Sequence, residues 1–388
     1  MDLTGYFSPV DVDVWRGGLP KAHAIAGQLT SFDVNGKMPA ITPKDIVIVG
    51  IPEARNSSNA SASFAPNEIR RFLYALSASA IKSNLIDLGN IKNTAKTADT
   101  YTATRDIISY LTSKGATVVV LGGTQELTWH TYQGVKEHRE SAGVSIIDSR
   151  IDLGFDESDF GSSCYYNHLL KEPITNLLNL SVLGYQGYLV AQEQTEKIKA
   201  SGLELVRLGA IRGRFKEVEP ILRDSDIVSL DMSSIRESDC PGVLYPSPNG
   251  LYAEEACQLA RYAGLSDRTS VFGIYELATS ADRNGQSAHL AAQLIWHFIE
   301  GHGQRKGEFP YTRSKELKKF IVGTSTPGID LVFYRSIVSD SWWVEIPSGI
   351  PNLFPEDKVT IACSYNDYVA ASKQEIPDRW MHFYRKLM

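Results

Sequence analysis

Apolar runs recur at near-regular intervals along roughly the first 300 residues. Most of them are continuously apolar rather than alternating, which is typical of parallel strands buried on both faces. Helical stretches separate the runs, and this alternation predicts right-handed crossovers. The eight predicted strands are residues 45–53, 84–91, 116–123, 143–154, 180–189, 204–211, 226–235 and 269–277. The pattern predicts an α/β fold: a three-layer α/β/α sandwich around a mainly parallel eight-stranded sheet.

The pattern changes over residues 301–314, which are rich in Gly, charge and Pro. Beyond them, three strand-like runs joined by turns precede a short terminal helix, as in a small α+β unit. We therefore predict an α/β/α domain over 1–301, with an N-terminal arm over 1–40, and a C-terminal extension over 302–388. Three roles are open to the extension: capping an active-site mouth, forming a subunit interface, or covering core surface.

Composition excludes several classes of partner. The chain has 388 residues, 43% of them hydrophobic, with a net charge of −6 and four cysteines that form no CxxC. Its acidic balance provides no basic face for nucleic acid or anionic lipid. No apolar run approaches the ~18 residues of a membrane span, and the acidic N-terminus is unlike a signal peptide. The sequence predicts a cytoplasmic protein with reduced thiols and no membrane or nucleic-acid partner.

Three short stretches each follow or end a predicted strand: GGTQE at 122–126, SIIDSRID at 145–152 and SLDMSS at 229–234. Ligands bind at the carboxyl edge of open α/β sheets, so these stretches should share one site. The site would gather three buried carboxylates, which repel one another unless a cation lies among them. These carboxylates are those of Asp148, Asp152 and Asp231.

The order of these stretches resembles the ureohydrolase family of arginase, agmatinase and formimidoylglutamase, whose motifs are GGDH, DAHxD and SFDxD. Residues 65–74, 240–256 and 275–301 also resemble family segments, so the likeness covers roughly residues 40–301. The resemblance implies the arginase fold. It also implies a pair of manganese ions bridged by a hydroxide, which attacks an amidine or guanidine carbon.

The resemblance assigns roles residue by residue. Asp148 and Asp231 match the two bridging aspartates, and Asp152 matches a terminal ligand of the first metal. Glu276 matches an acid that pairs with a guanidinium in some members, and His168 matches a proton-shuttle histidine. Catalytic roles would thus fall to Asp152, His168 and Glu276. Purely structural roles remain open for His168 and Glu276.

Three ligand positions depart from the family pattern. Gln125 replaces a first-metal histidine, Arg150 the second-metal histidine and Ser233 the second-metal aspartate. Three carboxylates and the Gln125 amide oxygen form a remnant first site that suits Mg²⁺, Ca²⁺ or Mn²⁺, although Gln125 could instead bond a neighbouring loop. We expect no cation or a single divalent one, with the manganese pair not assembled.

Arg150 brings a permanent positive charge to the second position. A guanidinium offers five donors in a fork suited to carboxylates. We therefore hypothesise that Arg150 forms salt bridges with Asp148 and Asp231 where the second metal would lie.

Two functions compete on this basis. In the favoured one, the chain is a catalytically degenerate member of the family that acts as a binding or structural protein. In the other, it is an active metal-dependent hydrolase of a linear amidine or guanidine C–N bond. Either form would take a small guanidino or formimino ligand, and we expect a homo-oligomer, as in relatives.

Overall fold

The computed structural model describes residues 1–13, 18–32, 37–139, 141–308, 314–324, 330–351 and 353–388. Within these residues, the main sheet has ten strands. Eight of them run parallel in the order β4-β3-β5-β10-β9-β6-β7-β8, and short β1 and β2 pair with β4 at one edge. The strands are β1 (Phe7–Ser8), β2 (Thr30–Ser31), β3 (Ile46–Ile51), β4 (Leu85–Ile91), β5 (Thr117–Gly122), β6 (Ala142–Ile147), β7 (Leu177–Tyr185), β8 (Glu204–Arg207), β9 (Ile227–Asp231) and β10 (Val271–Tyr275).

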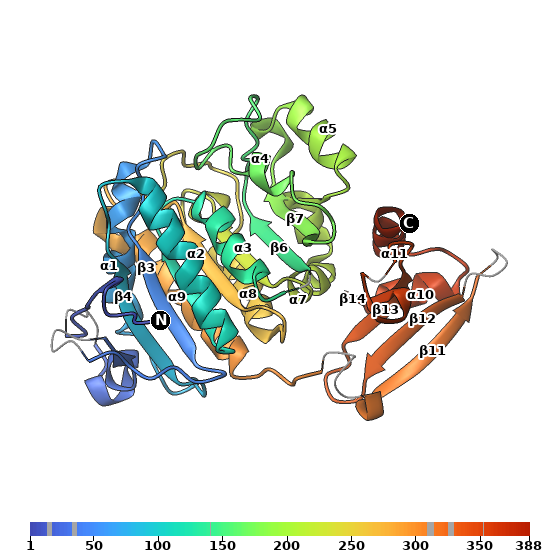
Figure 1. Cartoon of the computed structure of the whole chain (residues 1–388), viewed down its shortest axis with the longest axis horizontal. Coiled ribbons are helices and arrows are strands. Elements are labelled where there is room, and N and C mark those ends of the chain that lie inside the picture. The colour runs from blue at the N-terminus through green and yellow to red at the C-terminus, as the bar shows by residue number, and fades with distance from the viewer. Residues whose placement is uncertain (14–17, 33–36, 140, 309–313, 325–329, 352) are drawn as a thin grey trace.

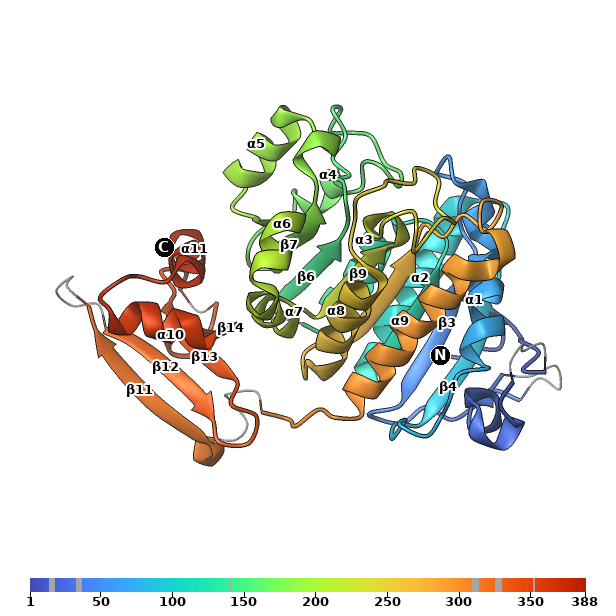
Figure 2. The ribbon, with the colours of Figure 1, turned by 180° about the vertical axis from the view of Figure 1, so that it is seen from behind.

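Helices cover both faces of this sheet (Figures 1 and 2). One face packs against α1 (Ala65–Leu73), α6 (Leu208–Gly213), α7 (Glu219–Arg223), α8 (Ala253–Leu265) and α9 (Gln286–His302). The other packs against α2 (Thr97–Ser113), α3 (Leu127–Lys136), α4 (Tyr166–Leu169) and α5 (Gln192–Ala200). The predicted α/β/α sandwich and its eight strands are confirmed.

The burial of the strands explains why the apolar pattern is continuous. All residues of β3 and β5 are buried. Within β5, Val119 and Leu121 pack into one hydrophobic core, while Val118 and Val120 pack into the core on the opposite face. Since successive side chains point to opposite faces, a strand with helices on both sides needs an apolar residue at nearly every position.

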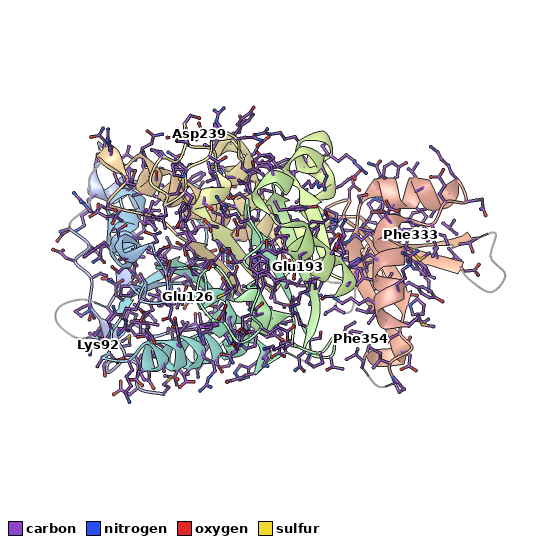
Figure 3. All side chains as sticks on the ribbon, turned by 90° about the horizontal axis from the view of Figure 1, so that it is seen from above. Lys92, Glu126, Glu193, Asp239, Phe333 and Phe354 are labelled. Carbon is purple, nitrogen blue, oxygen red and sulfur yellow. The ribbon has the colours of Figure 1, made fainter. Side chains whose placement is uncertain are left out.

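The extension is a second, antiparallel sheet of order β11-β12-β13-β14 with two helices. Its elements are β11 (Leu317–Gly323), β12 (Asp330–Ser336), β13 (Trp342–Pro347), β14 (Lys358–Cys363), α10 (Tyr365–Ser372) and α11 (Asp378–Leu387). Strand β11 and helix α10 were not predicted. The sequence of β11, LKKFIVG, contains two adjacent lysines and no continuous apolar run of strand length, and none of its residues is fully buried. Figure 3 shows the two units from above, with Phe333 labelled in the extension and Glu126 in the main domain.

The extension docks where strands of the main sheet begin. Arg379 of α11 donates to the carboxylates of Glu204, the first residue of β8, and Asp224, which precedes β9. Leu178, near the start of β7, belongs to the extension's hydrophobic core. Figure 1 shows β14 beside α7. The extension therefore covers the amino-terminal ends of β7, β8 and β9 and does not cap the carboxyl edge, where the predicted site lies.

None of the described helices combines the length and the apolar character that crossing a membrane requires.

Candidate metal and ligand site

Four neighbouring central strands build the candidate site. In the order β5-β10-β9-β6, register pairs Leu121 with Ile274, Leu230 with Ile147, and Tyr275 with Asp231. Their carboxyl ends are therefore level. Strands β5 and β6 are consecutive in the chain but not adjacent in the sheet, because β9 and β10, the last two strands of the main sheet, lie between them. Such a reversal of strand order is where open α/β sheets bind ligands.

The residues that follow these strands are the ones predicted from sequence. Asp231 ends β9, Asp148 follows β6, Gln125 lies in the turn after β5, and Glu276 follows β10. The turn after β5 requires glycine, because a Cβ on Gly123 would lie 1.8 Å from the carbonyl oxygen of Glu53. The same turn bonds the end of β10, because the Gly123 carbonyl accepts from the Glu276 N–H at 3.0 Å.

Asp148, Asp152 and Asp231 form a cluster. Each offers one carboxylate oxygen, and these atoms lie within 4.8 Å of one another. Asp148 is 1% exposed, and its Oδ2 has no hydrogen-bond partner in the described chain. Its Oδ1 accepts from the Arg150 backbone N–H at 3.0 Å, and Asp231 Oδ1 accepts from the Ser233 N–H at 2.6 Å. Backbone N–H groups outside the cluster thus hold Asp148 and Asp231 in place.

Burial and mutual repulsion make ionisation of these acids costly. Burial, followed by the charges of Asp152 and Asp231, raises the pKa of Asp148 well above its usual range. Burial, followed by the charges of Asp231 and Glu276, does the same to the pKa of Asp152. Burial raises the pKa of Asp231 to about 6. A bound cation would relieve this repulsion.

The side-chain amide of Gln125 completes the cluster. One end lies 3.3 Å from both Asp152 Oδ2 and Asp231 Oδ2, and the other lies 3.2 Å from Ser229 Oγ. The Ser229 hydroxyl can accept from the amide nitrogen or donate to the amide oxygen. The amide can therefore donate to two carboxylates when no cation is present, or turn its oxygen toward a cation.

These residues fit one divalent cation. Oxygens around a common cation can be about twice the metal–oxygen distance apart, roughly 4–5 Å for Mg²⁺ or Ca²⁺. The three carboxylate oxygens meet this limit, and the partnerless Asp148 Oδ2 leaves a buried acceptor unsatisfied. Asp148, Asp152, Asp231 and Gln125 would hold such an ion.

The second metal position does not fit. Ser233 and Arg150 bond the acids through their backbone N–H groups, and neither an arginine nor a neutral hydroxyl replaces the missing histidine and aspartate. The expected salt bridges are also absent: within the described residues, no carboxylate lies within 4.0 Å of the Arg150 guanidinium. That group instead lies over the Tyr245 ring, 5.6 Å from its centroid. Its charge still lowers the pKa values of Asp152 and Asp231, against the larger effect of burial.

Glu276 is held in a strained conformation beside the cluster. Its φ of 63° is unusual for a residue other than glycine. Oε1 accepts from the Gln125 backbone N–H at 3.0 Å, and Oε2 accepts from Asn59 Nδ2 at 3.0 Å. Burial, followed by the charge of Asp231, raises the pKa of Glu276 to about 8. Strained residues of this kind concentrate at ligand sites.

His168 does not join the acids. Its ring packs against Trp129 and edge-on against Phe160, with centroid separations of 5.5 and 4.9 Å. Burial lowers the pKa of His168. Within the described chain, it is not among the residues that line the pocket beside the acids. The ring of His168 therefore packs among aromatic side chains, and its proton-shuttle role stays a prediction from the sequence.

A pocket of about 490 Å³ opens beside the acids. Sequence reasoning identified five of its lining residues, Arg150, Asp152, Asp231, Ser233 and Glu276, and missed the others. The missed residues are Asn56, Ser57, Ser58, Ser162, Ser163, Leu244 and Tyr245. For the asparagine and the serines, the sequence signal was the small polar residues in the loops after β3 and β6. Leu244 and Tyr245 lie in the loop after β9 and had no such signal.

Sequence reasoning also missed Glu126, which directly follows Gln125. It is buried and accepts from Thr124 Oγ1 at 2.9 Å and from the Tyr101 hydroxyl at 3.2 Å. Burial raises the pKa of Glu126 to about 7. Tyr101 also accepts from Asn56 Nδ2 at 2.9 Å, so the buried acid is linked to the pocket wall through one hydroxyl.

A doubly covered parallel sheet with an acidic, cation-type site at its carboxyl edge defines the class of protein. The family model described as "Arginase family" matches residues 44–300. The chain belongs to the arginase family.

Its relatives in sequence include formimidoylglutamases. That of Bacillus subtilis (strain 168) is 24% identical over 279 residues, covering 66% of this chain and 87% of the relative. That of Lysinibacillus sphaericus is 26% identical over 261 residues, covering 63% of this chain and 80% of the relative.

Solved structures share the fold. Formimidoylglutamase of B. subtilis superposes with a TM-score of 0.66 at 21% identity, covering 75% of this chain and 95% of that one. Formiminoglutamase of Trypanosoma cruzi, solved with Mn²⁺, superposes with a TM-score of 0.62 at 22% identity, covering 68% of this chain and 94% of that one. Both matches span most of the relative and leave part of this chain outside.

Proposed function

We propose that this arginase-family chain binds one divalent cation together with a small ligand and does not perform the two-metal hydrolysis of its relatives. One observation carries the proposal. The cluster of Asp148, Asp152 and Asp231 can surround one cation, whereas the second position presents only Arg150 and Ser233, whose backbone N–H groups already bond the acids.

The loss of the second position has a chemical consequence. Paired divalent cations supply Lewis acidity to both the attacking and the leaving group of a displacement. Arg150 supplies charge but is no base, because its guanidinium keeps its proton. Burial, followed by the charge of Asp231, raises the pKa of Glu276 to about 8, which disfavours its ionised form as a base. The chain's own residues therefore bind and orient a ligand well but provide a weak route for proton removal.

The pocket chemistry supports a small guanidino or formimino ligand. Asp152, Asp231 and Glu276 line it and offer carboxyl oxygens to a planar N–H donor, while Tyr245 and Leu244 provide apolar contact. A planar donor set matches carboxylate geometry.

An active hydrolase is the second candidate, and one observation favours it. The pocket beside the acids is open, with a volume of about 490 Å³, and its wall retains the acidic residues. A protein selected only as a structural partner has no need of such a pocket.

Metal content and activity distinguish the two. We expect protein purified with Mn²⁺, Mg²⁺ or Ca²⁺ to carry one ion per chain by elemental analysis. We also expect no urea, ammonia or formamide release from guanidino or formimino substrates. Two ions per chain, or turnover with one, would overturn the proposal.

Restoring the missing ligands provides the complementary test. The triple variant Gln125→His, Arg150→His and Ser233→Asp should bind a second ion, because it returns two imidazoles and a carboxylate to the cluster. The single variant Arg207→His, at the end of the edge strand β8, serves as control and should still bind one ion.

A further inference from the structure

Arg150 is a partly buried arginine whose guanidinium stacks on an aromatic ring instead of pairing with an acid. Its backbone is fixed by the bond to Asp148 Oδ1, and one face of its guanidinium lies over the Tyr245 ring. Within the described residues, no carboxylate pairs with it, although it lines the same pocket as three acids. Stacking on an aromatic ring uses the face of a guanidinium and leaves its in-plane N–H groups available.

In-plane guanidinium N–H groups bind the two oxygens of a carboxylate or phosphate in a parallel, bidentate arrangement. The same pocket is lined by Ser57 and Ser58, whose hydroxyl groups can donate. These donors suit an oxyanion. The neighbouring acids oppose it, because Asp152 and Asp231 would repel a second negative group in the same pocket.

A divalent cation on the acid cluster removes this opposition. It offsets most of the charge of the three aspartates, and together with Arg150 it presents positive charge from two directions. We propose that Arg150 and a cation held by Asp148, Asp152 and Asp231 form a composite site for a small oxyanion. The carboxylate or phosphate group of the ligand binds there only when the cation is present.

The inference rests on the single-cation site of the proposed function and adds the chemistry of the ligand's anionic group. It has a thermodynamic signature. If the anion requires the cation, each must raise the affinity of the other by the same factor. Removal of the Arg150 charge should abolish that coupling while leaving the three aspartates free to bind the cation.

The test is calorimetric titration of the full chain with Mg²⁺, with and without saturating inorganic phosphate, and with acetate in a second series. In the wild type, we expect phosphate or acetate to tighten Mg²⁺ binding about tenfold, which is within the usual range of coupling between sites. The series with the larger effect identifies the preferred group. Arg150→Met should bind Mg²⁺ without anion at least as tightly as wild type, with anion coupling below about twofold.

Arg207→Met is the matched control. Arg207 also lies over a tyrosine ring, that of Tyr185, with a separation of 5.7 Å, and it does not line the described pocket. It should retain the full coupling.

The outcomes separate the two proposals. Equal coupling in Arg150→Met and wild type overturns the composite site alone, because the cation then binds the anion without the arginine. Mg²⁺ binding without any anion effect in the wild type does the same. A wild type that binds no divalent cation overturns both proposals.

Discussion

Two groups of largely buried acids lie at opposite edges of the same sheet. At the amino edge, Glu204 and Asp224 both bond Arg379, with distances of 2.8–3.0 Å. At the carboxyl edge, Asp148, Asp152 and Asp231 cluster without an internal cation. Arginine is present near both groups, yet only Arg379 enters its cluster. At the carboxyl edge, the guanidinium of Arg150 turns to the Tyr245 ring instead.

The pKa values record the difference. Burial alone would raise the pKa of Glu204, but the charge of Arg379, with smaller effects of His382 and the Ser181 hydroxyl, holds it below its usual value. At the other edge, burial and repulsion raise the pKa values of all three aspartates. The first group is complete within the chain, whereas the second is complete only with a cation from outside. We infer structural docking at one edge and ligand binding at the other.

The largest effect should come from removing the internal cation. Arg379→Met leaves Glu204 and Asp224 without their cationic partner, and breaking a buried pair in this way typically costs about 3–5 kcal/mol. Urea unfolding followed by tryptophan fluorescence should show this loss in the extension, which contains Trp342, Trp343 and Trp380.

The matched control for that variant is Arg335→Met. Arg335 pairs with Asp340, and both side chains are well exposed, 40% and 72%. Exposed pairs contribute about 0–1 kcal/mol. A loss in Arg379→Met no greater than in Arg335→Met would contradict the docking role.

The parallel strands and the acids at the carboxyl edge of the sheet could be predicted from the sequence, whereas the acids at the amino edge could not. Continuous apolar runs located all eight parallel strands, and motif order brought Gln125, Asp148, Asp231 and Glu276 together at their carboxyl ends. These features depend on local periodicity and on one topological rule.

The Arg379 cluster could not be predicted, because Glu204 and Arg379 are 175 residues apart. No local pattern links a helix of the extension to an edge strand of the main sheet. The Arg150 error has a related cause. Charge balance favoured a salt bridge, but the position of the side chain depends on Tyr245, which lies in a loop with no regular pattern. Similarly, His168 was assigned by loop position, whereas packing against Trp129 and Phe160 decides where its ring lies.

pH should affect the two edges with opposite sign. Folding raises the pKa of Asp231 from 3.8 to about 6 and that of Glu276 from 4.5 to about 8. Their contribution to stability is therefore greatest below the unfolded values and is lost as pH rises from about 4 to about 8. Glu204, whose pKa is lowered, contributes above its unfolded value and loses that contribution as pH falls.

In chelator, we expect the free energy of unfolding of the main domain to fall by roughly 2–3 kcal/mol between pH 6 and pH 8. The measurement is urea unfolding followed by far-UV circular dichroism at each pH. Added Mg²⁺ should flatten the profile, because a cation favours the ionised acids. A stability that rises over this range in chelator would mean that the acids are already compensated within the fold.

A smaller gain in stability should follow from removing one repelling charge. In chelator at pH 8, Asp231→Asn should stabilise the chain by roughly 1–2 kcal/mol, the equivalent of about one pKa unit. The amide oxygen can still accept from the Ser233 N–H. With Mg²⁺ the wild type should be the more stable of the two proteins, since only its folded state is stabilised by binding the cation. Asp340→Asn, at a largely exposed carboxylate, should change neither value; destabilisation by Asp231→Asn in chelator would contradict the repulsion argument.

The smallest effect is expected from Arg150→Met, the counterpart of Arg379→Met at the other edge. Arg150 is only partly buried, and its described contact is with the Tyr245 ring, an interaction that contributes about 0.5–1 kcal/mol at exposed sites. Loss of its charge also increases repulsion among the acids slightly, so we expect destabilisation of no more than about 1 kcal/mol in chelator. Urea unfolding of the two methionine variants under one set of conditions measures the contrast directly. A loss near that of Arg379→Met would show that the Arg150 guanidinium enters the acid cluster in solution, and the two edges would then be alike.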